Sequence, residues 1–403
     1  MKKITMVALI IAALCVAPVC AADRAPQARQ KKLYTVLTYV AGINDLNSFI
    51  NADLNEMRAG AYQGAYQLAF VNTYKDNKSA MAQRIVVTPQ GFYQDGPTLY
   101  NLDSGTPDTV IQAVLWAIDN YPSEYFVLNF WDHGSGPLNR SLIAHKRGIC
   151  YDFLTGHYLN DYDMMKVLST AQKRLGHNVN LVTCDACLMA GVELAFSLRP
   201  YVDHYVSSQE VIPGAGYQYQ YVLDPLKNNP NPVEFAKKIV AAFDQCYRGT
   251  TWDYTLSAVQ LNKIDPVVNS VNTVAILLLQ ALQSSARASV LTAIKRAAYS
   301  NPNIRFEERD YVDLYNLYRN LINELQLLRL DAALANNLNR ALRDGMAYIQ
   351  QAVFERVSST RFNPVQGLSI YFPASEIHSS YTQLYWTRSV PNWLALLRAV
   401  VGR

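Results

Sequence analysis

The chain has few charged residues and no strong excess of either sign. Only 17% of its 403 residues are Asp, Glu, Lys or Arg, whereas 50% are hydrophobic. This composition excludes a largely disordered chain, which would combine low hydrophobicity with high net charge. The formal net charge is +4, and removing Lys2 and Lys3 with the N-terminal segment gives 4 − 2 = +2. Such a nearly neutral protein has no overall attraction to nucleic acid or to an anionic membrane.

Glycine, proline and cysteine are also scarce. The 18 Gly and 17 Pro are too few for a collagen-like or low-complexity protein. Six cysteines in 403 residues cannot form a disulfide scaffold, so each needs its own explanation. The length is compatible with two or three domains, or with one large α/β domain carrying additions.

The N-terminus has the features of an export signal. Met1-Lys2-Lys3 is followed by an apolar stretch that closes on the small residues Ala21 and Ala22, so residues 1–22 are predicted to be a cleaved signal peptide. A membrane anchor is the alternative, but the apolar run is short and is broken by Pro18. Lipidation at Cys20 is disfavoured because Val19 is bulky. No later segment has 18 consecutive apolar residues, so we expect a secreted or periplasmic protein without stable membrane insertion after signal removal.

Strand and helix patterns alternate along the first half of the chain. Apolar or β-branched runs predict strands at 32–41, 68–73, 84–88, 125–131, 179–183 and 203–208. Helical spacing separates most of them, which predicts a mainly parallel sheet with helices on both faces. The second half is mostly helical, with long helices expected at 267–291, 311–328 and 331–353 and strands at 254–261 and 367–372. We place a domain boundary near residue 230, dividing 23–230 from 231–403.

Two reactive side chains follow predicted strands. His133 comes after the strand at 125–131, and Cys187 comes after the strand at 179–183. In an open α/β sheet, ligands bind at the carboxyl ends of the strands. A thiolate nucleophile needs a base, usually His, and the spacing of 187 − 133 = 54 residues with His first is typical of caspase-type enzymes. The predicted helix from about Met189 would add a dipole that favours a Cys187 thiolate. The backbone N–H groups of Gly134 and Cys187 could form an oxyanion hole.

Other interpretations of these residues remain open. A single Cys or His is most often structural, although the pair at two strand ends favours function. Cys184 and Cys187 also form a C-x-x-C pair, which suggests a redox dithiol or half of a zinc site. The zinc site lacks a second C-x-x-C, and the redox pair leaves His133 unexplained, so we expect Cys184 to be buried at the strand end. Asp185 either projects into a specificity pocket or caps a backbone turn.

These motifs resemble the clostripain family of cysteine peptidases, which is related to caspases, gingipains and legumains. The stretches that carry the resemblance are Asp132-His133-Gly134-Ser135-Gly136, Asp185-Ala186-Cys187-Leu188-Met189, Asn44-Asp45-Leu46, Ala52-Asp53-Leu54-Asn55-Glu56-Met57, Ser208-Gln209-Glu210 and Gly367-Leu368-Ser369-Ile370-Tyr371-Phe372-Pro373. The match covers roughly residues 33–375. It implies a caspase-like α/β fold with His133 as the catalytic histidine, Cys187 as the nucleophile, and cleavage after Arg or Lys.

One position departs from the family pattern. The family usually carries an acidic residue in the Pro-Gly-x-Gly turn that lines the pocket for a basic side chain, and here this residue is Ala215. Asp185 would remain as a single carboxylate, so a pocket for a smaller or uncharged side chain is the alternative to one for Arg or Lys. Members often process themselves in the loop after the His motif, which suggests cleavage after Arg147. No cofactor is expected to be required. Some members need calcium, for which this sequence has no clear site.

The leading hypothesis is therefore an exported cysteine endopeptidase that acts on peptides or proteins. A thiol–disulfide oxidoreductase using Cys184 and Cys187 is a competing enzyme class. A catalytically inactive peptide-binding module is the alternative without enzymatic activity.

Overall fold

A single ten-stranded sheet forms the centre of the protein in the computed structural model, which describes residues 29–138 and 148–402. The strand order is β11-β9-β8-β7-β6-β1-β2-β3-β4, with β5 paired to β3. The strands are β1 (Lys32–Ala41), β2 (Ala65–Asp76), β3 (Ser79–Thr88), β4 (Gly91–Gln94), β5 (Leu99–Tyr100), β6 (Ser123–Trp131), β7 (Val179–Asp185), β8 (Val202–Ser207), β9 (Thr255–Gln260) and β11 (Val353–Ser358).

The five central strands, β2-β1-β6-β7-β8, are parallel, and the strands at both edges are antiparallel. Alternate residues of β1 face opposite sides of the sheet, so that Leu37 and Tyr39 join one hydrophobic cluster and Val36 and Val40 join another. Burial on both faces explains why these strands are nearly continuous apolar runs. The prediction of a mainly parallel α/β sheet is confirmed.

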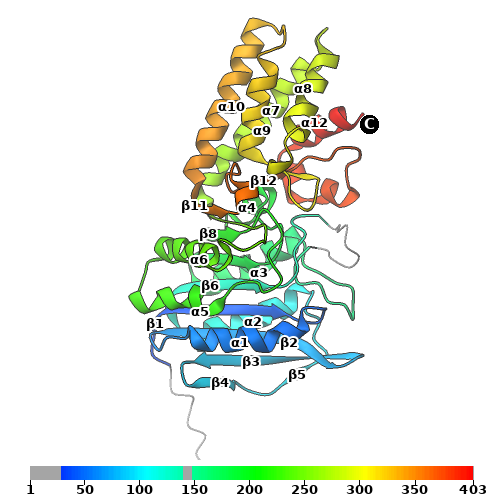
Figure 1. The fold of residues 1–403 in the computed structure, drawn as a ribbon. Coiled ribbons are helices and arrows are strands. Elements are labelled where there is room, and N and C mark those ends of the chain that lie inside the picture. Colours follow the sequence, from blue (N-terminus) through cyan, green and yellow to red (C-terminus); the bar gives the residue numbers. More distant parts are fainter. Residues whose placement is uncertain (1–28, 139–147, 403) are drawn as a thin grey trace, which may run out of the picture.

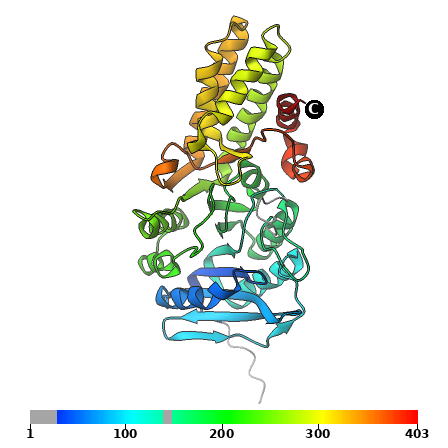
Figure 2. The ribbon, with the colours of Figure 1, turned by 45° about the vertical axis from the view of Figure 1, so that its right-hand side comes forward.

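Helices cover both faces of the sheet (Figure 2). One face packs against α2 (Pro107–Asn120), α3 (Asp161–Leu175) and α4 (Val192–Leu198). The other face packs against α1 (Ile50–Ala59), α5 (Tyr219–Leu223) and α6 (Pro232–Tyr247).

The remaining helices form a bundle beyond one end of the sheet (Figure 1). They are α7 (Ile264–Ala281), α8 (Arg287–Tyr299), α9 (Leu314–Leu325), α10 (Ala332–Ala352), α11 (Tyr385–Ser389) and α12 (Pro391–Val401), with a small antiparallel pair, β10 (Tyr311–Asp313) and β12 (Ser369–Tyr371). Their buried residues continue the hydrophobic cluster of α2, α3 and α4. In the described chain one helical stretch, Leu261–Ala281, has the length and composition to cross a membrane, and half of it is buried inside the protein, as is usual for a core helix.

Several predicted boundaries differ from the structure. The helix expected at 267–291 is two helices, because Ser284 donates to the Ala281 carbonyl at 2.8 Å and accepts from the Ala286 N–H at 3.2 Å, which replaces helical bonds between α7 and α8. The helix expected at 311–328 begins as β10, and the Asp313 side chain caps α9. Strands β9 and β11 follow residue 230 and still belong to the central sheet, so this sheet spans the expected domain boundary.

A buried glutamate joins the sheet to the second half of the chain. Glu193, in the first turn of α4, is 1% exposed. Its Oε1 accepts hydrogen bonds from the Tyr371 N–H at 2.9 Å and from the Tyr381 hydroxyl at 3.1 Å. Burial raises the pKa of Glu193 from 4.5 to about 7.

Replacing Glu193 with Gln should make stability less dependent on pH. Between pH 4.5 and 7 the unfolded chain has lost the Glu193 proton while the folded chain retains it, so folding stability falls as pH rises through this range. Glu193→Gln removes this contribution, which amounts to at most about 3 kcal/mol. Urea unfolding at pH 5, 6 and 7.5 measures the effect, with the exposed Glu234→Gln as control. Parallel pH curves for Glu193→Gln and the wild type would contradict the assignment.

Candidate active site

The register of two parallel strands brings the two predicted reactive residues to the same edge of the sheet. Trp131, the last residue of β6, pairs with Asp185, the last residue of β7. The Asp132 N–H donates to the Asp185 carbonyl at 3.2 Å and extends this pairing by one step. His133 and Cys187 each lie two residues beyond the paired positions, and both line one cavity of about 330 Å³.

Gly134 lies directly against the backbone of Cys187. A Cβ atom at position 134 would be 2.2 Å from the Cys187 carbonyl oxygen and 3.0 Å from the Cys187 nitrogen. Only glycine permits such a close approach of two backbones. The two segments expected to supply oxyanion donors are therefore in contact.

The chain turns sharply after Cys187. Leu188 has a φ of 63°, a left-handed conformation that is uncommon for a residue with a side chain. Its N–H donates to the Glu210 carbonyl at 3.1 Å, and the Cys187 Sγ accepts from the Ile212 N–H at 3.3 Å. The segment after β8 therefore holds the Cys187 turn in place.

The prediction that a helix dipole favours the Cys187 thiolate is wrong. Helix α4 begins at Val192, so residues 188–191 separate its first turn from Cys187. The effect of a helix dipole falls off within the first turn.

Asp45 is a site residue that sequence reasoning missed. It follows β1, the neighbour of β6, and its Oδ1 lies 2.5 Å from His133 Nε2. The Asp45 side chain is 65% exposed and that of His133 is 7% exposed. The Asn44 amide fixes this loop by donating to the Ala41 carbonyl at 2.8 Å and to Asp132 Oδ1 at 2.6 Å. The available signal was the polar pair Asn44-Asp45, which follows within four residues of the end of a buried strand.

Asp185 combines the two roles considered from sequence. It lines the cavity, and it also binds the following turn, because the Tyr217 N–H donates to both carboxylate oxygens at 3.0–3.1 Å and the Tyr219 hydroxyl donates to Oδ2 at 2.8 Å. Burial raises its pKa to about 7. Ala215 is exposed on this turn and lines the same cavity.

The wall of the cavity is acidic. Of the described residues that line it, four are Asp or Glu and none is Lys or Arg. Three of these acids had no predicted role, namely Asp53 on α1, Asp132 after β6 and Glu307 from the segment before β10. The lining residues are Leu46, Asp53, Trp131, Asp132, His133, Asp185, Ala186, Cys187, Val211, Ile212, Pro213, Gly214, Ala215, Gly216 and Glu307. A cation in this cavity would favour the charged forms of these carboxyl groups.

Comparison with known proteins gives the family. The family model described as "Clostripain family" matches residues 38–393, which is most of the chain. The chain belongs to the clostripain family. The resemblance inferred from sequence is thereby confirmed.

Individual relatives of the clostripain family are distant. Clostripain from Hathewaya histolytica is 23% identical over 332 residues, which are 73% of this chain and 61% of that protein. A solved secreted C11 cysteine protease from Bacteroides thetaiotaomicron, in complex with an irreversible peptide inhibitor, has a TM-score of 0.66 at 22% identity and covers 91% of this chain and 99% of its own. An inactive zymogen C11 protease from Parabacteroides distasonis has a TM-score of 0.61 at 19% identity and covers 90% of this chain and 99% of its own. The predicted caspase-like fold is confirmed.

The other described cysteines of this clostripain-family chain have thiols that are hard to ionise. Cys184 is fully buried, its Sγ is 3.5 Å from the Tyr205 hydroxyl, and burial raises its pKa to about 12. In the described chain Cys184 and Cys187 are separate thiols. Burial likewise raises the pKa of Cys246 to about 11 and that of Cys150 well above its ordinary value. The prediction that Cys184 is buried is correct.

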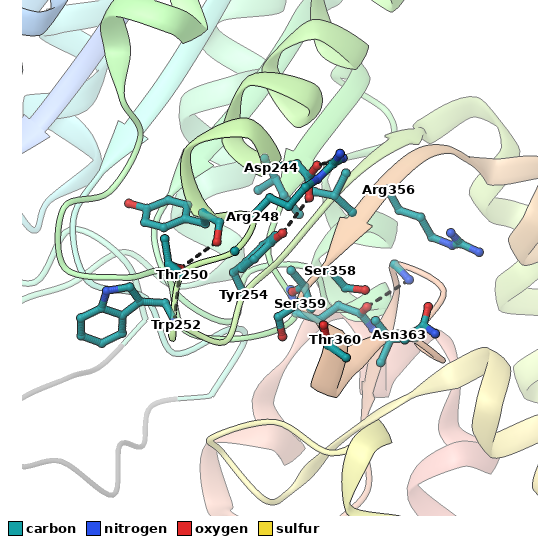
Figure 3. Close-up of a pocket in the computed structure, with 18 residues that line it drawn as sticks. Asp244, Arg248, Thr250, Trp252, Tyr254, Arg356, Ser358, Ser359, Thr360 and Asn363 are labelled. Carbon is teal, nitrogen blue, oxygen red and sulfur yellow. Dashed lines mark hydrogen bonds and ion pairs between the residues drawn. The ribbon is translucent and has the colours of Figure 1, made fainter.

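A second cavity, of about 410 Å³, lies between α6, β9 and β11 (Figure 3). Its buried acid, Asp244, accepts from the Tyr254 hydroxyl at 2.7 Å and is also paired with Arg248. None of the described residues that line this cavity is Cys or His, so we assign it no chemistry.

Three expectations have no structural test. Residues 1–22 of the predicted signal peptide and Arg147, the suggested self-cleavage site, lie outside the described residues. For calcium, residues 29–138 and 148–402 contain no group of three or more His, Cys, Asp or Glu side chains that could hold a metal ion.

Gly134→Ala should abolish activity without unfolding the protein. The new Cβ would collide with the Cys187 backbone and displace the turn that carries the thiol. The matched control is Gly214→Ala on the rim of the same cavity, where a Cβ meets no atom within 4 Å. Peptidase assays should give a loss of about 100-fold or more for the first variant and near wild-type activity for the second. Equal activities for the two variants would refute the close packing at position 134.

Proposed function

We propose that the protein is an exported cysteine endopeptidase that hydrolyses peptides or proteins with Cys187 as nucleophile and His133 as acid and base. The observation that carries this proposal is that both residues line one cavity at the carboxyl edge of β6 and β7, in a chain of the clostripain family. Ligand sites of parallel sheets lie at this edge.

The reaction follows from these groups. Cys187 Sγ gives its proton to His133 and attacks the substrate carbonyl carbon, forming a C–S bond and an oxyanion. The Gly134 and Cys187 N–H groups donate to that oxyanion. The C–N bond breaks as His133 returns the proton to the leaving amine. His133 then takes a proton from water, and the resulting hydroxide attacks the thioester carbon. The C–S bond breaks to release the acid, and His133 returns its proton to sulfur to restore the thiol.

Asp45 positions His133 in this scheme. Its contact with Nε2 leaves Nδ1 as the ring nitrogen that exchanges a proton with Cys187 Sγ. A carboxylate at this distance also stabilises the imidazolium that forms during the reaction. Because Asp45 is largely exposed, solvent screens the charge and the contribution is modest.

Asp45→Asn should lower kcat about tenfold with little change in KM, because the side chain contacts His133 and is not among the described residues that line the cavity. Steady-state kinetics with one fluorogenic peptide gives both values. Asp103→Asn is the matched control, since it removes a similar His–carboxylate contact, 2.6 Å from His157, away from the cavity. An unchanged kcat, or an equal effect of the control, would contradict a positioning role.

We propose that the cavity holds a basic side chain, Arg or Lys, next to the cleaved bond. The four acidic lining residues support this proposal, and the family resemblance implies the same preference. Ala215 leaves the turn at 213–217 without a carboxylate of its own, so the charge must come from other elements.

Export and self-processing complete the proposal. Export rests on the predicted signal peptide at 1–22 and is supported by the secreted status of the similar Bacteroides thetaiotaomicron protease. Self-cleavage after Arg147 rests on its place in the loop that follows the His motif, and it agrees with a pocket for a basic side chain.

Cysteine substitutions separate the proposal from the two alternatives. Cys187→Ala should lower peptidase activity by about 10³-fold or more and leave the chain uncut after Arg147. Cys184→Ala should keep activity near the wild-type level, because its thiol is buried and hard to ionise. Gel analysis and peptide hydrolysis measure both effects. Equal losses from the two variants would favour a thiol–disulfide oxidoreductase, and the absence of hydrolysis in the wild type would favour a peptide-binding module.

A further inference from the structure

The cavity has alanine at position 215, where the family usually has an acidic residue, but another acidic residue, Asp53, lines it from a different element. Ala215 supplies no charge, so Asp185 is the one remaining carboxylate of the two that the family pattern places around a basic side chain. Removing a guanidinium or ammonium from water is costly unless several charged or polar groups replace its hydration. Asp53 lines the same cavity, although it lies 185 − 53 = 132 residues before Asp185.

Asp53 is held rigidly at this place. It lies in the first turn of α1 and is 7% exposed. Its Oδ2 accepts from the Trp131 indole N–H at 2.6 Å, and Trp131 is the last residue of the strand that leads to His133. The carboxylate is therefore fixed to the strand end from which His133 emerges.

Asp53 and Asp185 act on each other electrostatically. Burial and then the charge of Asp185 raise the pKa of Asp53 to about 8. Burial raises the pKa of Asp185 to about 7, and Glu56 on the same helix as Asp53 adds to this. Two carboxyl groups in one desolvated wall are unfavourable when both are charged, and a cation between them removes that repulsion.

The two acids also differ in their remaining capacity for hydrogen bonds. Asp185 already accepts from the Tyr217 N–H and the Tyr219 hydroxyl. In the described chain, Trp131 is the one hydrogen-bond donor recorded for Asp53. A carboxylate can accept about four hydrogen bonds, so Asp53 can offer more of them to a ligand.

We propose that Asp53 is a specificity-determining residue, which supplies the second carboxylate for an Arg or Lys side chain in the place left by Ala215. The pocket is then formed by the first turn of α1 and the end of β7, and the turn at 213–217 supplies only its rim. This inference rests on the proposed peptidase function and deepens it.

Paired substrates test the inference. Two fluorogenic peptides are used, one with arginine and one with its neutral isostere citrulline on the acyl side of the cleaved bond. Their kcat/KM values are compared for the wild type and for Asp53→Asn, which keeps the acceptor for Trp131. The variant should lose about 10- to 100-fold in kcat/KM for arginine, the range for one charged hydrogen bond, and change less than about threefold for citrulline. Adding Ala215→Asp to Asp53→Asn should restore at least part of the arginine preference.

The possible results separate failure of the role of Asp53 from failure of the peptidase function. Equal losses for arginine and citrulline peptides, or no loss for either, would overturn the role of Asp53 while the peptidase proposal stands. A wild type that prefers citrulline over arginine would do the same. A wild type that cleaves neither peptide would overturn the preference for a basic side chain and the role of Asp53 with it. Only the absence of hydrolysis of any peptide would refute the proposed peptidase function itself.

Discussion

The parallel pairing of β6 with β7 is the constraint on which the site depends. Because Trp131 pairs with Asp185, the two residues that follow each strand leave the sheet side by side. The second of these residues is His133 after β6 and Cys187 after β7. The same pairing sets Gly134 against the Cys187 backbone. Strand β1 lies on the other side of β6, and its loop brings Asp45 to the His133 ring. A shift of one residue in this register would turn the reactive side chains to opposite faces of the sheet.

The acidic cavity is built from distant parts of the chain around this edge. Asp53 comes from the helix after β1, Asp185 from the end of β7, and Glu307 from the mostly helical second half. The Glu307 N–H donates to both oxygens of Glu210, whose own carbonyl accepts from the Leu188 N–H beside the thiol. The second half of the chain is thus linked to the turn that carries Cys187.

The sequence predicted the central strands because burial on both faces produces long apolar runs. It also predicted the ends of β6 and β7, because the polar motifs that contain His133 and Cys187 follow these two runs. It could not predict the strand register, which decides that His133 and Cys187 share a cavity. Asp45 and Asp53 were missed for a related reason. An aspartate after a strand or in the first turn of a helix is ordinary capping chemistry, and only tertiary contacts with His133 and Trp131 distinguish these two. The start of α4 was predicted at about Met189, but the chain turns at Leu188, whose backbone is left-handed, and the helix begins only at Val192.

Covalent labelling tests the central claim most directly, namely that Cys187 is a nucleophile activated by His133. The protein is treated with one equivalent of a peptidyl chloromethyl ketone that ends in arginine, and the adduct is mapped by mass spectrometry. We expect a single adduct on Cys187, formed much more slowly in His133→Ala, with Cys150, Cys184 and Cys246 unmodified. Labelling at another cysteine, or labelling of Cys187 at the same rate without His133, would contradict it.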